Sequence, residues 1–306
     1  MNQYDVLVYG PLFCDLIFTD LDRLPELGTE IFAGDFTVAP GGSAIVAAGL
    51  QKLGVRVGLI ADLGDDPFSQ IMRGMLDDLH IDRALIREHP HPLPQLTVAL
   101  SFPHDRAFIT RFEQPHTAHD LRAILAQHRP RHLHIGSFLA AFDAPDACRI
   151  AHEIEATVSM DPGWDEVALR DPRLREMLND LDYFLPSRSE LCYMMETEDA
   201  DKALSDGIAL MPYGAIIMKD GANGAFAHGQ RMKAHVPALT VQPVDTTGAG
   251  DAFDAGFIYG LINGHPIEEC MRYGVVCGGL TTTVAGGATG TPTREDVEQW
   301  LSKLRS

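Results

Sequence analysis

Short apolar segments alternate with helix-like segments along most of this chain. Asp5–Tyr9 has the length and composition of a buried strand, and the alanine-rich segment Ser43–Leu53 is typical of a helix. In a further helix expected over 68–79, Ile71, Met75 and Leu79 recur at four-residue spacing, which places them on one face. Strands that alternate with helices predict a parallel sheet covered on both sides. Other strands are expected at 55–60, 132–135, 157–160, 183–185 and 215–219, and other helices near 144–155 and 172–180.

Two stretches interrupt the alternation, at about 12–39 and 94–112. They lack helical periodicity and contain three β-like runs, Glu30–Phe36, Leu96–Phe102 and Ala107–Phe112. We expect these runs to form a separate small sheet.

Composition limits the partners of the chain. The formal net charge of −19 over 306 residues argues against nucleic acid or an anionic membrane as a partner, because both need clustered Lys and Arg. The N-terminal residues carry no basic segment followed by an apolar one, and no apolar run is long enough to span a bilayer. The five cysteines form no CxxC pair, which favours reduced thiols. A cytoplasmic location is therefore expected.

The segment from Asp245 to Asp251, DTTGAGD, is the strongest candidate for a reactive site. Gly248 and Gly250 leave the backbone amides around Ala249 unobstructed as a helix begins, and such a helix start binds anions. Asp251 falls in the first turn, where its carboxylate could accept a proton from an alcohol while the amides hold a phosphoryl group. The alternative interpretation is that Asp251 only caps the helix.

The run DTTGAGDAFDAGF, beginning at Asp245, resembles the C-terminal signature of the ribokinase-like (PfkB) family of carbohydrate and nucleoside kinases. Pro40–Ala44, followed by Val46–Gly54, resembles the di-glycine sugar-binding motif of the same family. This resemblance covers nearly the whole chain. It implies one domain over 1–306, an α/β three-layer sandwich with a mostly parallel central sheet, and a small β-sheet lid made by 12–39 and 94–112. It also implies transfer of the γ-phosphate of MgATP to a hydroxyl group of a small molecule.

The resemblance assigns roles to residues on the acceptor side. Asp251 would be the base, with the amides near Gly248, Ala249 and Gly250 as the anion hole. The substrate-binding residues would be Asp15, Gly41, Gly42 and the residue at position 45. Relatives commonly carry Asn at that last position, whereas this chain has Ile45, which cannot bond a sugar hydroxyl in the same way.

The resemblance also assigns a nucleotide side. Ser187 and Glu190 match an N-x-x-E motif in which Ser replaces the usual Asn, and Glu190 would help to hold Mg²⁺ through water. A helix N-cap formed by Ser187 or Ser189 is the alternative interpretation of the same motif, and the two interpretations are compatible with each other. Backbone carbonyls of Asp245 and Thr247 would hold a monovalent cation such as K⁺. The residues expected to line ATP are Ser187, Glu190, Lys219, Gly221, Gly224 and Gly287.

Several questions stay open at the level of sequence. Arg106 and Arg111 could bind a phosphorylated acceptor or could be solvated strand-edge residues. His132 and His134 share strand alternation but have no third ligand in view, so no transition-metal site is expected. A sugar is the expected acceptor, with a nucleoside, or a catalytically weak sensor of either, as alternatives. A dinucleotide-dependent oxidoreductase is disfavoured because no G-x-G-x-x-G follows the first strand. A homodimer formed through the lid is also expected.

Overall fold

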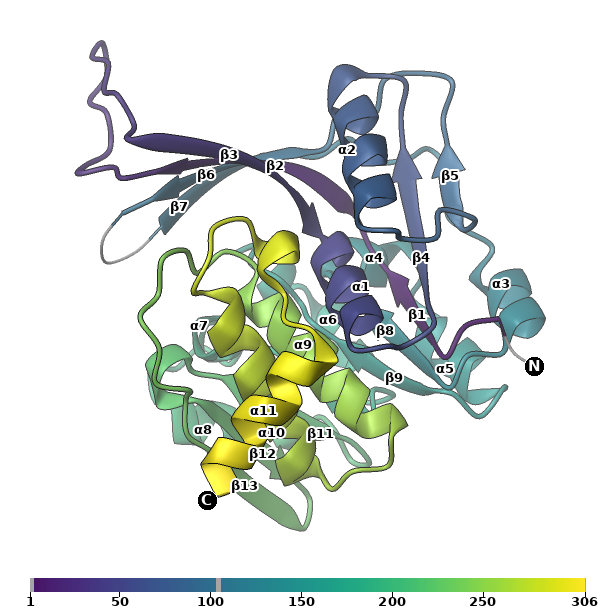
Figure 1. Ribbon diagram of the computed structural model, residues 1–306. Helices are drawn as coiled ribbons and strands as arrows, with labels where there is room; N and C mark the ends of the chain where they lie inside the picture. The colour runs from purple at the N-terminus through teal and green to yellow at the C-terminus, as the bar shows by residue number, and fades with distance from the viewer. Residues whose placement is uncertain (1–2, 103–105, 306) are drawn as a thin grey trace.

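The core of the molecule is a large, mostly parallel sheet covered by helices on both faces (Figure 1). The computed structural model describes residues 3–102 and 106–305, and within these ranges the large sheet has nine strands in the order β13-β12-β11-β10-β9-β8-β1-β4-β5. β12 pairs antiparallel with both β11 and β13, and the other neighbouring strands of this sheet pair parallel. The predicted fold class is therefore confirmed. The strands are β1 (Val6–Tyr9), β4 (Val57–Leu63), β5 (Ile86–Glu88), β8 (His132–Ile135), β9 (Thr157–Met160), β10 (Tyr183–Phe184), β11 (Ala215–Lys219), β12 (Ala225–Gly229) and β13 (Met232–Val236).

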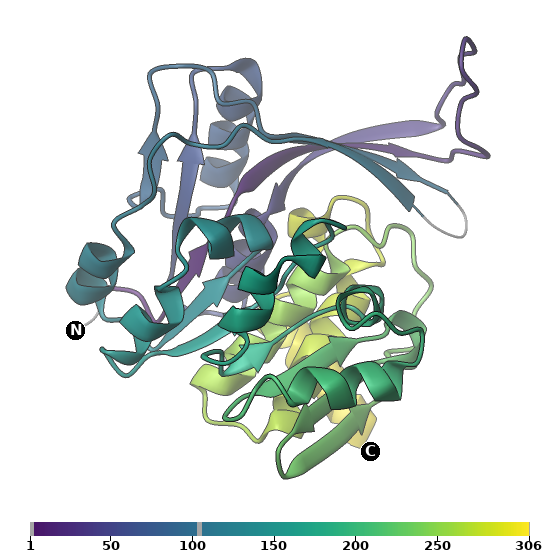
Figure 2. The same cartoon turned by 180° about the vertical axis from the view of Figure 1, so that it is seen from behind.

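The helices form two layers, one on each face of the large sheet (Figures 1 and 2). One layer holds α1 (Ser43–Lys52), α2 (Pro67–Asp78), α9 (Ala249–Ile262), α10 (Ile267–Thr281) and α11 (Arg294–Arg305). The other layer holds α3 (Leu121–His128), α4 (Phe138–Asp143), α5 (Ala147–His152), α6 (Pro172–Met177), α7 (Arg188–Met194) and α8 (Ala200–Ile208). Short 3₁₀ segments are η1 (Ala168–Arg170), η2 (Gly221–Asn223) and η3 (Gly287–Gly290).

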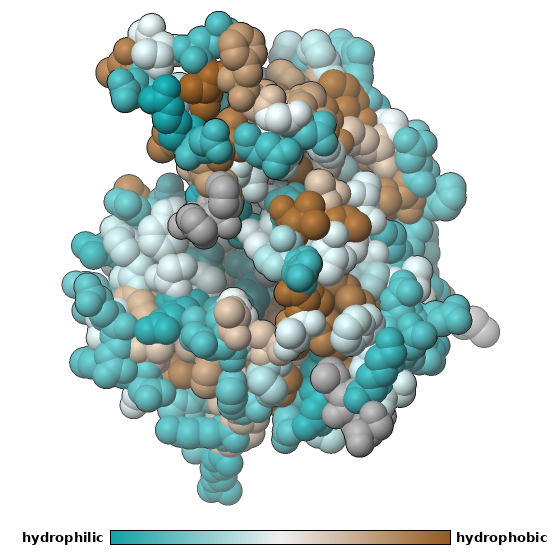
Figure 3. All heavy atoms as spheres, turned by 60° about the vertical axis from the view of Figure 1, so that its left-hand side comes forward, coloured by the Kyte–Doolittle hydropathy of each residue, from teal (hydrophilic) through white to brown (hydrophobic). Residues whose placement is uncertain are grey.

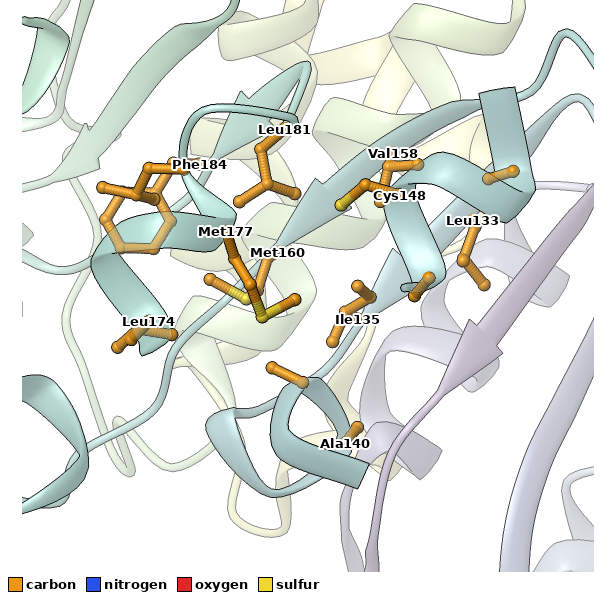
Figure 4. Packing of buried hydrophobic residues seen from close by; sticks show 14 of the residues in the cluster. Leu133, Ile135, Ala140, Cys148, Val158, Met160, Leu174, Met177, Leu181 and Phe184 are labelled. Carbon is orange, nitrogen blue, oxygen red and sulfur yellow. The ribbon is translucent and has the colours of Figure 1, made fainter. Parts of the chain in front are cut away.

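Strand β1 shows how one segment serves both layers. Val6 and Val8 pack with the α1 and α9 layer, whereas Leu7 and Tyr9 pack with the opposite one, as the alternation of side chains along a strand requires. Because all four residues are buried, the strand is apolar throughout rather than alternating. Figure 4 shows part of the buried cluster that contains Leu7 and Tyr9, in which side chains of β8, β9 and β10 pack against α4, α5 and α6.

Helix α2 presents a different face from the one expected. The predicted stripe was Ile71, Met75 and Leu79, but Ile71 is 42% exposed and the buried residues are Ser69, Met72 and Leu76. The packed stripe lies one position further on, where Met72 and Leu76 enter the buried cluster formed with residues of α1 and β4. Asp66 caps the helix, which begins at Pro67. This prediction was wrong by about a quarter of a turn.

Four strands form a separate small sheet that projects from the body (Figures 1 and 2). They are β2 (Leu12–Thr19), β3 (Asp35–Gly42), β6 (Leu96–Ser101) and β7 (Arg106–Arg111), in the order β3-β2-β6-β7 among the described residues. The expected small sheet is thus present. The strand predicted at Glu30–Phe36 was misplaced, since β3 begins at Asp35 and continues through the paired glycines.

Candidate active site

The segment Asp245–Asp251 forms a turn that leads into α9. The buried Asp245 carboxylate accepts hydrogen bonds from the backbone amides of Thr247, at 2.9 Å, and Gly286, at 3.1 Å. These bonds join the turn to the loop that precedes η3, which lies 41 residues further along the chain. Two predicted site segments are therefore held together by one carboxylate.

Gly248 is required by both conformation and packing. Its φ is 73°, and a Cβ atom there would lie 2.8 Å from Ile45 Cδ1 and 3.0 Å from Gly287 Cα. Within the described chain no side chain caps α9, although the Ala249 amide donates to Thr246 O at 3.3 Å. Open amides and the helix dipole make this helix start suitable for an anion.

Asp251 lies in the first turn of α9, beside those amides. Burial raises the pKa of its carboxyl group to about 7, and the charge of Asp161 adds to this effect, while Lys219 and Arg106 oppose it. A carboxylate with a pKa near neutrality can accept a proton at physiological pH and release it again. The surroundings of Asp251 are therefore compatible with its predicted role as a general base.

A buried ion cluster lies directly behind the turn. The Lys219 Nζ atom is 2.7 Å from Asp161 Oδ2 and 3.1 Å from Asp254 Oδ1. Burial opposes the lysine charge, but Asp161, Asp254 and Glu190 together raise the pKa of Lys219, so it stays protonated. The cluster ties α9 to the ends of β9 and β11 and thereby fixes the position of Asp251.

Asp15 faces the turn from the small sheet. It lies within β2, paired in register with Ala39. Gly41 makes room for it, since a Cβ there would lie 2.1 Å from Asp15 Oδ2. Burial raises the pKa of Asp15 to about 8, and the charges of Asp251 and Asp245 contribute. In the space-filling view the small sheet overhangs a hollow in the body (Figure 3).

Ile45 lies under the turn. It is 2% exposed, and its Cδ1 atom faces both Gly248 and Gly287. Gly42, which has a φ of 61°, is the N-cap residue of α1. The hydroxyl group of the next residue, Ser43, is buried without a hydrogen-bond partner among the described residues. The position where relatives commonly carry Asn is thus filled by an apolar side chain that packs against the turn.

Ser187 and Glu190 form a capping box at the start of α7. The Glu190 amide donates to Ser187 Oγ at 3.2 Å, and the Ser187 amide donates to Glu190 Oε2 at 2.6 Å. The alternative interpretation of this motif, a helix N-cap, is confirmed. An isolated parallel bridge pairs Ser187 with Lys219, which places the capping box beside the ion cluster.

Two glycine-containing loops complete the predicted nucleotide side. Gly221 and Gly224 lie in the hairpin between the antiparallel strands β11 and β12. Gly287 begins η3, next to Gly248. The Lys52 ammonium group donates to carbonyl oxygens of this second loop, at 2.9 Å for Thr289 and 2.9 Å for Thr291.

Comparison with known proteins decides the family. The model of the pfkB family carbohydrate kinases matches residues 3–294. The chain belongs to the pfkB carbohydrate kinase family. The predicted family and enzyme class, a phosphotransferase with an alcohol group as acceptor, are thereby confirmed.

Relatives of this pfkB kinase cover it almost completely. It is 24% identical to the ribokinase of Bacillus subtilis, over 97% of this chain and 99% of the relative. It is 31% identical to an ATP-dependent ribose-1-phosphate kinase of Halopiger xanaduensis, over 92% and 93%. The structure of Arabidopsis thaliana ribokinase complexed with ribose and ATP superimposes with a TM-score of 0.82 at 22% identity, over 97% and 98% of the two chains. These matches agree on the ribokinase fold.

Three residues near this pfkB kinase site either were not predicted from the sequence or had no role assigned to them. Asp254 could have been noticed, since it lies one helical turn after Asp251 in the same signature. Asp161 follows the short strand β9, where nothing distinguishes it from a loop carboxylate. Arg106 was left open, and the structure brings its guanidinium to the Thr246 hydroxyl group at 2.7 Å.

The two strand histidines have a structural role in this kinase. His132 Nε2 and His134 Nδ1 both lie 2.8 Å from Ser159 Oγ, and burial lowers the pKa of the two imidazoles to about 3 and about 4 respectively. Across the described ranges no three His, Cys, Asp or Glu side chains gather in an arrangement that could hold a metal ion. A metal bound mainly by phosphate oxygens and water needs no such cluster.

Proposed function

We propose that this pfkB kinase transfers the γ-phosphate of ATP to a hydroxyl group of a sugar, with Asp251 as the base. The observation that carries the proposal is the position of Asp251, which lies at an uncapped helix start and has a pKa of about 7. The carboxylate would remove the acceptor proton as the hydroxyl oxygen attacks phosphorus. The ADP oxygen would leave in line, with no covalent enzyme intermediate.

The nucleotide would be held by the residues around the turn. The amides near Gly248, Ala249 and Gly250 would stabilise charge on the transferred phosphoryl group, and Lys219 lies beside Gly250. Ser187, Gly221, Gly224 and Gly287 are the further predicted ATP contacts. Glu190 would hold Mg²⁺ through water, and the ion would supply positive charge that offsets the charge of the phosphates. Backbone carbonyls of Asp245 and Thr247 are the proposed ligands of K⁺.

The acceptor would lie between Asp15 and Asp251. Ionised Asp15 can accept hydrogen bonds from two hydroxyl groups, and the amides of Gly41 and Gly42 adjoin it. Ile45 offers no such bond and is committed to packing. We therefore propose a sugar that is held mainly through Asp15, with a nucleoside as the alternative acceptor.

The small sheet would act as a lid and as a dimer interface. Covering the acceptor excludes water, which would otherwise compete for the phosphoryl group. The face turned away from the site is apolar, and its Phe36 and Ile109 side chains are 48% and 67% exposed. A second copy of the chain that packs there would bury this surface.

The proposed partners are small molecules and a second subunit. The net charge of −19 supports this proposal over nucleic acid or an anionic membrane. No helix in the described part of the chain is long and apolar enough to cross a bilayer. A cytoplasmic location stays a prediction.

The proposal is tested by measuring ADP formation with MgATP across ribose, fructose, ribose 1-phosphate and a set of nucleosides, with and without K⁺. We expect one class of acceptor to stimulate ADP formation well above the rate in water alone. Tight sugar or nucleoside binding without turnover across the panel would instead identify a sensor. A preference for nucleosides would replace the sugar by the alternative acceptor.

A further inference from the structure

Arg106 connects the small sheet to the phosphoryl-transfer turn. It begins β7, and its Nη1 atom donates to Thr246 Oγ1 at 2.7 Å, across 140 positions of sequence. Thr246 belongs to the turn that ends in Asp251. This contact joins the edge strand of the projecting sheet to the loop that carries the proposed base.

The strand register places Arg106 on the same face of the small sheet as Asp15. Thr110 pairs with Thr97, whose hydroxyl group lies 3.2 Å away, and Thr97 pairs with Asp15 on the neighbouring strand. Because side chains alternate along a strand, Arg106 shares this face with Thr110, and Arg111 lies on the opposite one. The Arg106 guanidinium also lies 5.3 Å from the centre of the Phe108 ring, which helps to direct it.

The guanidinium brings positive charge to a site rich in carboxylates. Asp15 faces Asp251 from the small sheet, and Asp161, Asp254 and Lys219 face it from the body. Lys219 is fixed by its bonds to the two body carboxylates. Its position therefore does not depend on the small sheet, whereas that of Arg106 does.

We propose that Arg106 is a positioning residue. When the small sheet rests on the turn, Arg106 brings its positive charge close to Asp251 and so favours the ionised form of the base. The inference rests on the proposed function of Asp251 and adds a coupling to it. With the sheet seated, Thr246 holds the guanidinium near Asp251, and its charge favours the carboxylate form that accepts the acceptor proton. When the sheet lifts away, this charge leaves with it. The ionised fraction of Asp251 is therefore highest when the small sheet covers the acceptor.

The test compares Arg106→Gln with Arg106→Lys in the full-length enzyme. kcat and KM are measured from pH 5.5 to pH 9 with MgATP and the best acceptor of the panel. Loss of the positive charge raises the pKa of Asp251, so the fall of kcat on the acid side moves to higher pH. We expect Arg106→Gln to shift this fall by about one pH unit and to lower kcat at pH 7 by about fivefold. Arg106→Lys is expected to stay close to wild type.

Two further variants separate charge from structure. Arg111→Gln removes a positive charge from the same strand on its opposite face and is expected to leave the pH profile unchanged. Thr246→Val removes the anchor but not the charge, so its shift should be smaller than that of Arg106→Gln. Because both residues act through one contact, the double variant should differ little from Arg106→Gln alone.

Several outcomes would overturn the inference. It fails if Arg106→Gln lowers kcat equally at every pH, or if it only raises the KM of a phosphorylated acceptor, which would make Arg106 a substrate-binding residue. It also fails if Arg106→Gln and Arg111→Gln behave alike. Thermal unfolding of each variant shows that it is folded. A wild-type enzyme without activity would contradict the proposed function itself. An active wild type whose pH dependence of kcat is unchanged by Arg106→Gln would contradict only the coupling.

Discussion

The turn at 245–251 and the acceptor side of the site are built in different ways. The turn is one continuous segment, held from within by the Asp245 carboxylate and from below by Ile45. The acceptor side is assembled from separate strands, with Asp15 on β2 and Arg106 on β7. The turn belongs to the main body, whereas these two residues belong to the projecting sheet.

Under the proposed function, this difference places the base and the anion hole on the turn and the acceptor contact of Asp15 on the small sheet. A continuous turn packed against buried helices can keep its geometry while other parts of the protein change. The small sheet reaches that turn through the contact between Arg106 and Thr246. We therefore expect substitutions in the turn to reduce kcat. On the acceptor side we expect substitution of Asp15 to alter the acceptor KM, and substitution of Arg106 to shift the pH dependence of kcat.

The largest effect is expected for Asp251→Asn. Removing the base should lower kcat by about a thousandfold, within the range for general acid–base catalysis. The amide is nearly the same size as the carboxyl group, so the unfolding temperature and ATP binding should stay close to wild type. The measurement is steady-state ADP formation together with calorimetric ATP titration. A variant that kept a tenth of the wild-type kcat would exclude Asp251 as the base.

The contrast between the two regions also explains what the sequence could predict. Seven contiguous residues contain the glycines, the amides and Asp251, so their chemistry could be predicted before the fold was known. Asp161 and Arg106 are brought to the site by pairing between strands that are far apart in the sequence. Local sequence patterns do not predict such pairing. Asp15 was predicted as a site residue, but its strand was not, because β2 leaves β1 after two residues and joins another sheet.

A large effect is also expected for Gly248→Ala. The new methyl group would meet Ile45 and Gly287 and would strain a residue with a φ of 73°. We expect a loss of kcat of about a hundredfold, as for loss of an oxyanion-hole donor, and a destabilisation of about 1–3 kcal/mol.

Gly74→Ala is the matched control for that substitution. Gly74 lies in α2 with no atom within 4 Å of an added Cβ. Alanine there should leave kcat unchanged and raise the unfolding temperature slightly. Similar losses in both variants would show that the effect at Gly248 is not specific to the turn.

An intermediate effect is expected for Asp15→Asn. Hydrogen bonds from acceptor hydroxyl groups to a charged carboxylate would be lost, which should raise the acceptor KM by about tenfold to a hundredfold with a smaller change in kcat. The wild-type KM should fall as pH rises through about 8, because the pKa of Asp15 is raised to that value and the ionised form binds hydroxyl donors. In the variant this pH dependence should disappear. An unchanged KM would place the acceptor elsewhere.

The smallest effect on catalysis is expected for Ile109→Glu, on the outer face of the small sheet. A charge there should disfavour packing of a second copy, so light scattering should report a lower mass than for wild type. We expect kcat to change by no more than about twofold, as for a substitution remote from the chemistry. An unchanged mass would argue against a dimer through this face, and a large loss of kcat would show that the two faces of the sheet are coupled.

The central claim is that a buried carboxylate with a near-neutral pKa accepts the acceptor proton, and the pH dependence of wild-type kcat tests it most directly. Burial raises the pKa of Asp251 to about 7, so the active, ionised form is lost as pH falls through that value. With saturating MgATP and acceptor, kcat should fall about tenfold per pH unit below the pKa. A kcat that stays constant down to pH 5 would contradict the account.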